Sequence, residues 1–344
     1  MTARPMDAIA VRNIMAADLG PGSIGLQINR GIVTSHLVSE TDNPHMRPSI
    51  EGLDADEIVD DMVNTLRRHP TYWISRDMQA LAVAAAMELP DDYAVEAHEM
   101  PSHRGLLVLS SPLASWDIRG RLMRTHAITW HRTGGDRVVF GCWTSKYDEG
   151  DELNREMMAA APPDAWAAFP AYTINVVSAV RLGQPIPHTI GLAGALIPSD
   201  ADIYTEDGID LSQAVLRDGA EEGVITAGPD PRVRFMTVVW RLMQQSLARV
   251  NQEEAPRPLA RQSKRLDLVP LVTVIQLRQI KRVRPGESAD VEWSHRWLRR
   301  GHWRRQWYKV DGVPVQKAIY IHPTVCGPDD KPLVIKDHVT ALVR

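Results

Sequence analysis

Apolar residues in the first ninety positions recur at helical spacing in two places. From 54 to 68 they return every four residues, acidic residues gather in the first turn, and Asp54 can cap the start, so a helix is predicted there. An alanine-rich segment over 74–89, stopped by Pro90, predicts a second helix. Residues 1–50 show little periodicity, which predicts an irregular lead-in with at most one early strand.

Strand-like patterns follow the two helices. Residues 105–110 form a short, continuously apolar run that is typical of a buried strand. Residues 125–132 and 137–145 flank Thr133-Gly-Gly-Asp136, which predicts a β-hairpin. An acidic, turn-rich stretch then leads to Gly228-Pro229, where we place a domain boundary.

Beyond that boundary the pattern predicts one helix, a linker and one strand. Apolar residues at spacings of three and four predict an amphipathic helix over 235–250. Residues 257–265 form a basic linker, and 268–277 are rich in the β-branched residues of a strand. We therefore expect an α+β protein with an acidic mixed α/β domain over 1–228. A smaller basic module over 229–344, made of a helix and antiparallel strands, would follow it.

The most distinctive segment runs from Trp293 to Tyr308. It holds four of the ten tryptophans, five arginines and two histidines. Both a helical and a strand period would bring the tryptophans to one face, so periodicity alone does not decide. The hairpin signal Asp311-Gly312 and the strand-like residues after it favour strands over 302–309 and 314–321, with a preceding strand over 293–298.

In such a hairpin the two faces would differ in chemistry. The tryptophans would share one face with His295, whereas the other would carry Arg296, Arg300, His302 and Arg304. Turning at 311–312 places Ile319 and Ile321 opposite Arg304 and His302, so the arginine face is also partly apolar. Two interpretations follow. The arginine stems cover apolar surface, or the arginines form a functional cationic face.

Charge is unevenly distributed along the 344 residues. Residues 232–317 hold nineteen lysines and arginines against seven acidic residues, a balance of +12, so the remainder carries −16 within a net charge of −4. Such a basic region favours partners that carry phosphate, although it could also pack on the acidic half of the chain.

Several classes of protein are disfavoured by the sequence. It has no long apolar run and no secretory signal, and Cys142 and Cys326 are isolated, so a cytoplasmic protein without a membrane span is expected. The four histidines of the last fifty residues lack the spacing of metal ligands, and no nucleotide-binding glycine motif occurs. Neither a metal nor a cofactor is expected.

Three functions remain open. The first is binding of RNA or DNA, in which arginines contact phosphate and exposed aromatic rings stack on bases. Its candidate residues are Arg296, Arg299, Arg300, Arg304, Arg305, Trp303, Trp307 and Tyr308. The second is a metal-independent, toxin-like ribonuclease that uses His302 with Arg300 and Arg304, and His295 or His322 as a second acid or base. The third is an interaction or inhibitor module whose acidic N-terminal half binds a host protein.

The C-terminal third also resembles a family of uncharacterised proteins from actinobacteria, their phages and integrated elements. The resemblance covers about residues 232–344, and an asparagine is usual in the family where this chain has Arg305. The matching blocks are Trp240-Arg-Leu-Met-Gln-Gln, Val274-Ile-Gln-Leu-Arg278, Val291-Glu-Trp-Ser-His-Arg-Trp297, Gly301-His-Trp-Arg-Arg-Gln-Trp-Tyr308, Ile321-His-Pro, Lys331-Pro-Leu-Val-Ile-Lys-Asp-His-Val339 and, more faintly, Met100-Pro-Ser-His-Arg-Gly-Leu-Leu. The resemblance implies a phage or mobile-element setting and assigns no catalytic residue.

Overall fold

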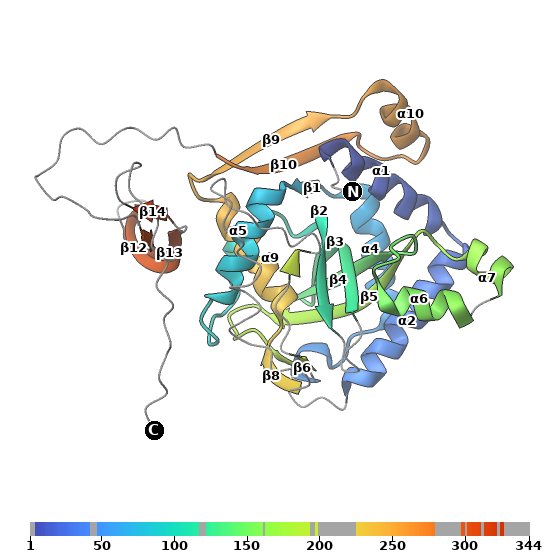
Figure 1. Cartoon of the computed structure of the whole chain (residues 1–344), viewed down its shortest axis with the longest axis horizontal. Coiled ribbons are helices and arrows are strands. Elements are labelled where there is room, and N and C mark those ends of the chain that lie inside the picture. The colour runs from blue at the N-terminus through green and yellow to red at the C-terminus, as the bar shows by residue number, and fades with distance from the viewer. Residues whose placement is uncertain are drawn as a thin grey trace, which may run out of the picture. The chain divides into compact units, whose positions relative to one another are not determined.

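The structure is a computed structural model, and it divides into two compact units, residues 1–278 and 279–344 (Figure 1). The described residues are 4–41, 47–116, 122–160, 162–192, 197–198, 225–278, 297–299, 301–310, 313–321 and 324–326.

The first unit is built around an eight-stranded mixed sheet. Its strand order is β5-β4-β3-β2-β1-β10-β9, and β7 pairs with β2. The strands are β1 (Thr71–Ile74), β2 (Arg104–Trp116), β3 (Leu122–Thr133), β4 (Arg137–Ser145), β5 (Tyr172–Arg181), β7 (Ile197–Pro198), β9 (Ala248–Glu254) and β10 (Leu271–Leu277). The central strand β1 runs parallel to both β2 and β10, whereas the other pairs are antiparallel. A separate ladder joins β6 (His188–Leu192) to β8 (Ile225–Pro229).

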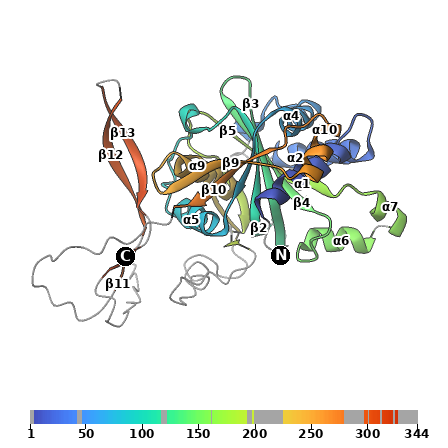
Figure 2. The ribbon, with the colours of Figure 1, turned by 90° about the horizontal axis from the view of Figure 1, so that it is seen from above.

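Helices cover both faces of this sheet (Figure 2). One layer contains α1 (Pro5–Asp18), α2 (Ile24–Thr41) and α4 (Ala55–Arg68), and the other contains α5 (Arg76–Met87) and α9 (Pro231–Met243). The shorter elements are α3 (Arg47–Ile50), the 3₁₀ turn η1 (Ala97–Glu99), α6 (Glu152–Ala160), α7 (Pro163–Ala168) and α10 (Arg257–Arg265). None of the helices among the described residues is long and apolar enough to cross a membrane.

Local signals in the sequence explain several of these elements. The carboxylate of Asp54 accepts a hydrogen bond of 2.9 Å from the backbone N–H of Glu57, which confirms the predicted start of α4. The predicted hairpin over 125–145 is β3 and β4, and its turn uses positive φ at Gly134 and Gly135. The strand predicted over 268–277 is β10. The α+β class is confirmed.

Large aromatic side chains fill the layer between the sheet and α9. Trp240 on α9 stacks on Phe140 of β4 with ring centroids 5.6 Å apart, and it contacts Trp130 of β3 at 5.7 Å. All three are fully buried. Burial of these rings stabilises the packing of α9 on the sheet, because each ring removes a large apolar area from water.

Two predictions about local structure were wrong, and another gave a helix the wrong bounds. The described residues within 1–50 are mostly helical and form α1, α2 and α3. The sequence pattern does not reveal α1, because its buried face includes the polar residues Arg12 and Asn13 and so lacks an apolar stripe. The helix predicted over 235–250 begins at Pro231, after the capping residue Asp230, and ends at Met243. It is buried on nearly every side, so spacing alone does not mark its ends.

The third correction concerns residues 257–265, which form helix α10 instead of a linker. Asp267, with φ of 56°, follows the helix, and the N–H of Leu268 bonds to the carbonyl of Ser263. The N–H of Asp267 bonds to the carbonyl of Lys264, which completes a Schellman arrangement that ends the helix.

The two compact units differ from the domains expected at 1–228 and 229–344. Helix α9 packs on α5, and β10 lies next to β1 inside the large sheet, so residues 229–278 group with the first unit. The basic stretch is consequently shared between both units. Whether the chain folds as two independent domains divided at 228 remains a proposal.

Candidate nucleic-acid interface

The second unit contains the hairpin expected from the Trp-Arg segment. Strand β12 (His302–Val310) pairs antiparallel with β13 (Val313–Ile321). The register joins Val310 to Val313 at one end and His302 to Ile321 at the other. Both predicted strands are therefore confirmed, and so is the predicted placement of Ile319 opposite Arg304.

One face of the hairpin carries aromatic rings with a cation between them. Because side chains alternate along a strand, Trp303, Arg305 and Trp307 lie on the same face. Trp303 lies opposite Tyr320, and their ring centroids are 5.2 Å apart. Tyr320 is 3% exposed, whereas Trp307 is 62% exposed and Arg305 is exposed. This face is called the aromatic face below.

The opposite face carries His302 and Arg304. Arg304 is exposed and His302 is half-buried, and their cross-strand partners are Ile319 and Ile321, both half-buried. The apolar character that the register predicted for this face is therefore present. A cation flanked by isoleucine fits either an arginine stem that covers apolar surface or a guanidinium that is held out to a ligand.

The remaining candidates can be placed only in part. Arg299 ends β11 (Trp297–Arg299), which pairs antiparallel with β14 (Thr324–Cys326). Tyr308 belongs to β12. Arg296, Arg300, His295 and His322 lie outside the described residues, as does most of the strand expected over 293–298. The structure thus brings together His302, Trp303, Arg304, Arg305 and Trp307 from the predicted set.

Tyr320 is a member of the aromatic face that sequence reasoning missed. The signal for it was present, because a turn at Asp311-Gly312 places residue 320 directly opposite residue 303. The same strand register places Ala318 across from Arg305 and Gln316 across from Trp307.

In the first unit, the resemblance block at 240–245 contacts Glu99, which directly precedes the fainter block at 100–107. Arg241 donates through Nε to a carboxylate oxygen of Glu99 at 3.0 Å, and Gln244 Nε2 donates to the backbone carbonyl of Glu99 at 2.9 Å. Ser102, in the other block, accepts a hydrogen bond from Trp130 Nε1 at 3.0 Å on its backbone carbonyl. Glu99 is 2% exposed, so these contacts hold η1 against α9 inside the protein and form no open site.

A second cluster joins α4 to the sheet through the half-buried Asp61 and Arg104 and the buried His131. Arg104 pairs with one oxygen of Asp61, and His131 Nε2 lies 3.7 Å from the other. His131 is 1% exposed, and this burial lowers its pKa to about 4, against the weaker attraction of Asp61. Since Arg104 already balances the carboxylate, the imidazole stays neutral near pH 7.

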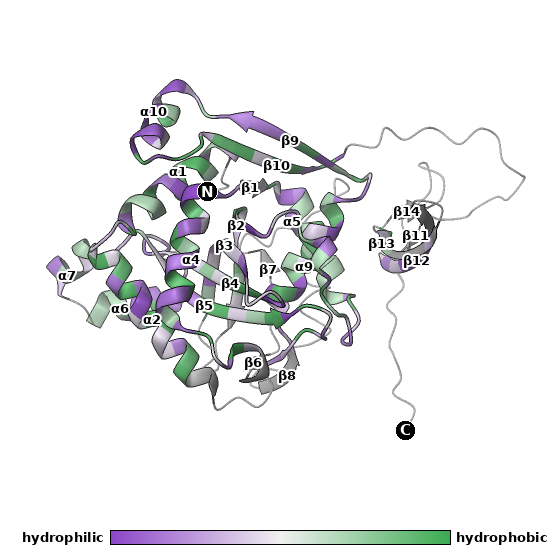
Figure 3. Ribbon diagram, turned by 180° about the vertical axis from the view of Figure 1, so that it is seen from behind, coloured by the Kyte–Doolittle hydropathy of each residue, from purple (hydrophilic) through white to green (hydrophobic). Residues whose placement is uncertain are grey.

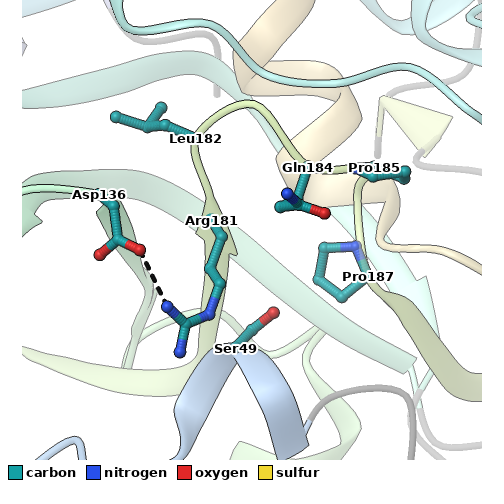
Figure 4. Close-up of a pocket in the computed structure, with 7 residues that line it drawn as sticks. All are labelled: Ser49, Asp136, Arg181, Leu182, Gln184, Pro185 and Pro187. Carbon is teal, nitrogen blue, oxygen red and sulfur yellow. Dashed lines mark hydrogen bonds and ion pairs between the residues drawn. The ribbon is translucent and has the colours of Figure 1, made fainter.

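The first unit also has a surface cavity of about 380 Å³ between α3 and the end of β5 (Figure 4). Its lining residues are Ser49, Asp136, Arg181, Leu182, Gln184, Pro185 and Pro187. The guanidinium of Arg181 pairs with Asp136 at 2.9 Å. This pairing leaves the cavity with little net charge for recognising a ligand. Across the parts of the chain that the structure describes, no three His, Cys, Asp or Glu residues are grouped so that they could hold a metal ion.

Comparisons with known proteins add little to this geometry. No protein-family model matches the chain, and no curated protein matches it. Among solved structures, the crystal structure of AcrVA2 is similar over 92% of both chains, with 12% sequence identity and a TM-score of 0.30. A likeness at that level carries no argument about function.

Proposed function

We propose that the protein binds nucleic acid and that the β12–β13 hairpin is its contact surface. The observation that carries the proposal is the exposure of Trp307 beside Arg305 on the aromatic face. A tryptophan ring that is 62% exposed forgoes the stabilisation of burial, and its flat face is open to stack on a ligand.

The chemistry of the aromatic face suits a single strand. An exposed indole can stack on any base, and a stacked base contributes roughly 1–3 kcal/mol to such complexes. Arg305 lies between the two tryptophans along β12 and can pair with a phosphate through its planar fork. Trp303, which contacts the buried Tyr320, instead anchors the hairpin.

Arg304 extends the cationic surface to the other side of β12. Since Arg304 and Arg305 are adjacent in a strand, they point to opposite faces and can contact a strand that wraps around the edge of the hairpin. Arg296, Arg299, Arg300 and Tyr308 belong to the same proposal. A phage or mobile-element setting and a cytoplasmic location belong to it as well; they rest on the family resemblance and on the isolated cysteines.

The experiment is a binding titration of the whole protein with labelled single-stranded RNA and with duplex DNA over a salt series. The proposal expects an affinity that falls steeply with salt, and an Arg304→Gln/Arg305→Gln variant with a salt slope smaller by about 1.4, since each lost contact with a single strand removes about 0.7. A wild-type protein that binds neither probe at low salt contradicts the proposal.

The two alternatives are separated when the length of the RNA in the same titration is also read on a gel. Shortened RNA that depends on His302 would favour a ribonuclease, in which His302 transfers a proton and Arg304 stabilises the charged phosphate. Intact, unbound RNA combined with specific capture of a host protein would favour an interaction module instead.

A further inference from the structure

Helix α10 presents four cations on one face. Arg257, Arg261, Lys264 and Arg265 follow one another at spacings of four, three and one residues. At 100° per residue they fall within an arc of about 100°, and over eight residues they span about 12 Å of the helix. All four are exposed. They are called the α10 basic stripe, and Figure 3 shows the helix largely in the colour of hydrophilic residues.

The opposite side of α10 fixes the stripe to the first unit. Ser263 is fully buried and accepts a hydrogen bond of 3.0 Å from Asn13 Nδ2 of α1. Leu259 packs against the main hydrophobic core. The Schellman arrangement at Asp267 ends the helix, so its orientation is set at the buried face and at its C-terminus. The cations are therefore held on a rigid element.

No carboxylate among the described residues forms an ion pair with these four cations. Glu254 and Asp267 flank the helix in sequence, yet neither lies within ion-pair distance of a stripe side chain. By contrast, the half-buried Arg30 of the first unit pairs with Asp60 at 2.8 Å. Four like charges that face solvent without counter-charges repel one another, and an anionic ligand would remove that repulsion.

The composition of the stripe distinguishes between classes of anionic partner. Protein interfaces depend on buried aromatic or aliphatic anchors, and α10 exposes no large apolar side chain. Insertion into an anionic membrane requires a free apolar face, and that of α10 is already packed through Leu259. A phosphate backbone needs neither, because guanidinium forks pair with phosphates directly.

We propose that the α10 basic stripe is a second nucleic-acid contact, located in the first unit and formed by Arg257, Arg261, Lys264 and Arg265. The inference rests on the proposed nucleic-acid function but uses residues separate from the hairpin. The stripe binds backbone phosphates without regard to sequence, and it adds to the affinity and to the salt dependence of the complex.

The test compares two doubly substituted full-length proteins that lose the same charge. The first is Arg261→Gln/Arg265→Gln in the stripe. The second is Arg76→Gln/Arg155→Gln, which removes two exposed arginines near the starts of α5 and α6. The probe is a labelled single-stranded RNA, titrated between low and moderate salt. We expect the stripe variant to bind roughly tenfold more weakly, with a salt slope lower by about 1.4, and the matched control to bind like the wild type.

A Trp307→Ala protein measured in parallel separates this inference from the hairpin proposal. A loss in Trp307→Ala with no loss in the stripe variant overturns the inference and leaves the hairpin proposal intact. A loss in the stripe variant alone supports the inference and contradicts the hairpin proposal. Equal losses in the stripe variant and its matched control overturn the inference, because total charge would then explain the binding. Tighter binding of a polyglutamate peptide than of RNA through the stripe also overturns it, in favour of an acidic protein partner.

Discussion

Trp303 and Tyr320 face each other across the β12–β13 ladder with ring centroids 5.2 Å apart and planes inclined by 56°. Four residues further along the same strand, Trp307 lies on the same face with most of its surface in solvent. Two tryptophans that are equivalent in the sequence pattern thus have different roles. One anchors the hairpin, and the other is available to a ligand.

Replacing Trp303 should therefore weaken the hairpin itself. Trp303→Ala removes a cross-strand aromatic pair, which contributes about 0.5–1.5 kcal/mol beyond the area it buries. We expect faster amide hydrogen exchange along β13 in this variant. Trp307→Ala provides the control on the same strand and should leave that exchange unchanged. Equal acceleration in both variants would show that Trp307 also has a structural role.

Stability should fall as the solution is acidified below neutral pH, because His131 is buried in its neutral form. Its folded pKa of about 4 lies below the unfolded value of 6.5, so this contribution is fully present above pH 6.5 and is lost as the pH falls toward 4. Between pH 7.5 and pH 5, the loss is about 2 kcal/mol. Urea titrations at the two pH values measure it. His131→Gln should reduce the difference between them, and an undiminished difference would assign the effect to other groups.

The pairing of Arg241 with the buried Glu99 should be costly to break. Arg241→Met leaves a carboxylate that is 2% exposed without its main cation, which costs about 3–5 kcal/mol. Arg30→Met breaks the pair with Asp60 at the surface and should cost less than about 1 kcal/mol. Thermal or urea unfolding of the two variants tests the contrast. Equal destabilisation would contradict the structural role assigned to the Arg241 block.

Elements with strong local signals could be predicted from the sequence. Asp54 marks the start of α4 through its side chain, and the two glycines after Thr133 supply the positive φ of a tight turn. The Asp311-Gly312 pair in the sequence predicts a register with Ile319 opposite Arg304, and the β12–β13 ladder has that register. Each of these signals acts within a few residues, so no tertiary information is needed to interpret it.

Elements that depend on tertiary burial could not be predicted in this way. The polar residues Arg12 and Asn13 are buried on α1 because Thr71 and Ser263 from distant segments bond to them. Residues 257–265 look like a solvated linker until Leu259 and Ser263 are seen to contact the first unit. The site was predicted in part, since the hairpin follows from its turn. The exposure that separates Trp307 from Trp303 depends on packing that the pattern does not contain.

The most direct measurement of the central claim is the affinity of wild-type and Trp307→Ala proteins for a labelled single-stranded RNA, determined side by side at low salt. Loss of one stacked base predicts a decrease of about fivefold to 150-fold for Trp307→Ala, from the roughly 1–3 kcal/mol that such a contact contributes. Trp307→Phe, which keeps an aromatic ring, should recover part of that loss. An unchanged affinity in Trp307→Ala, or no binding by the wild type, would contradict the account.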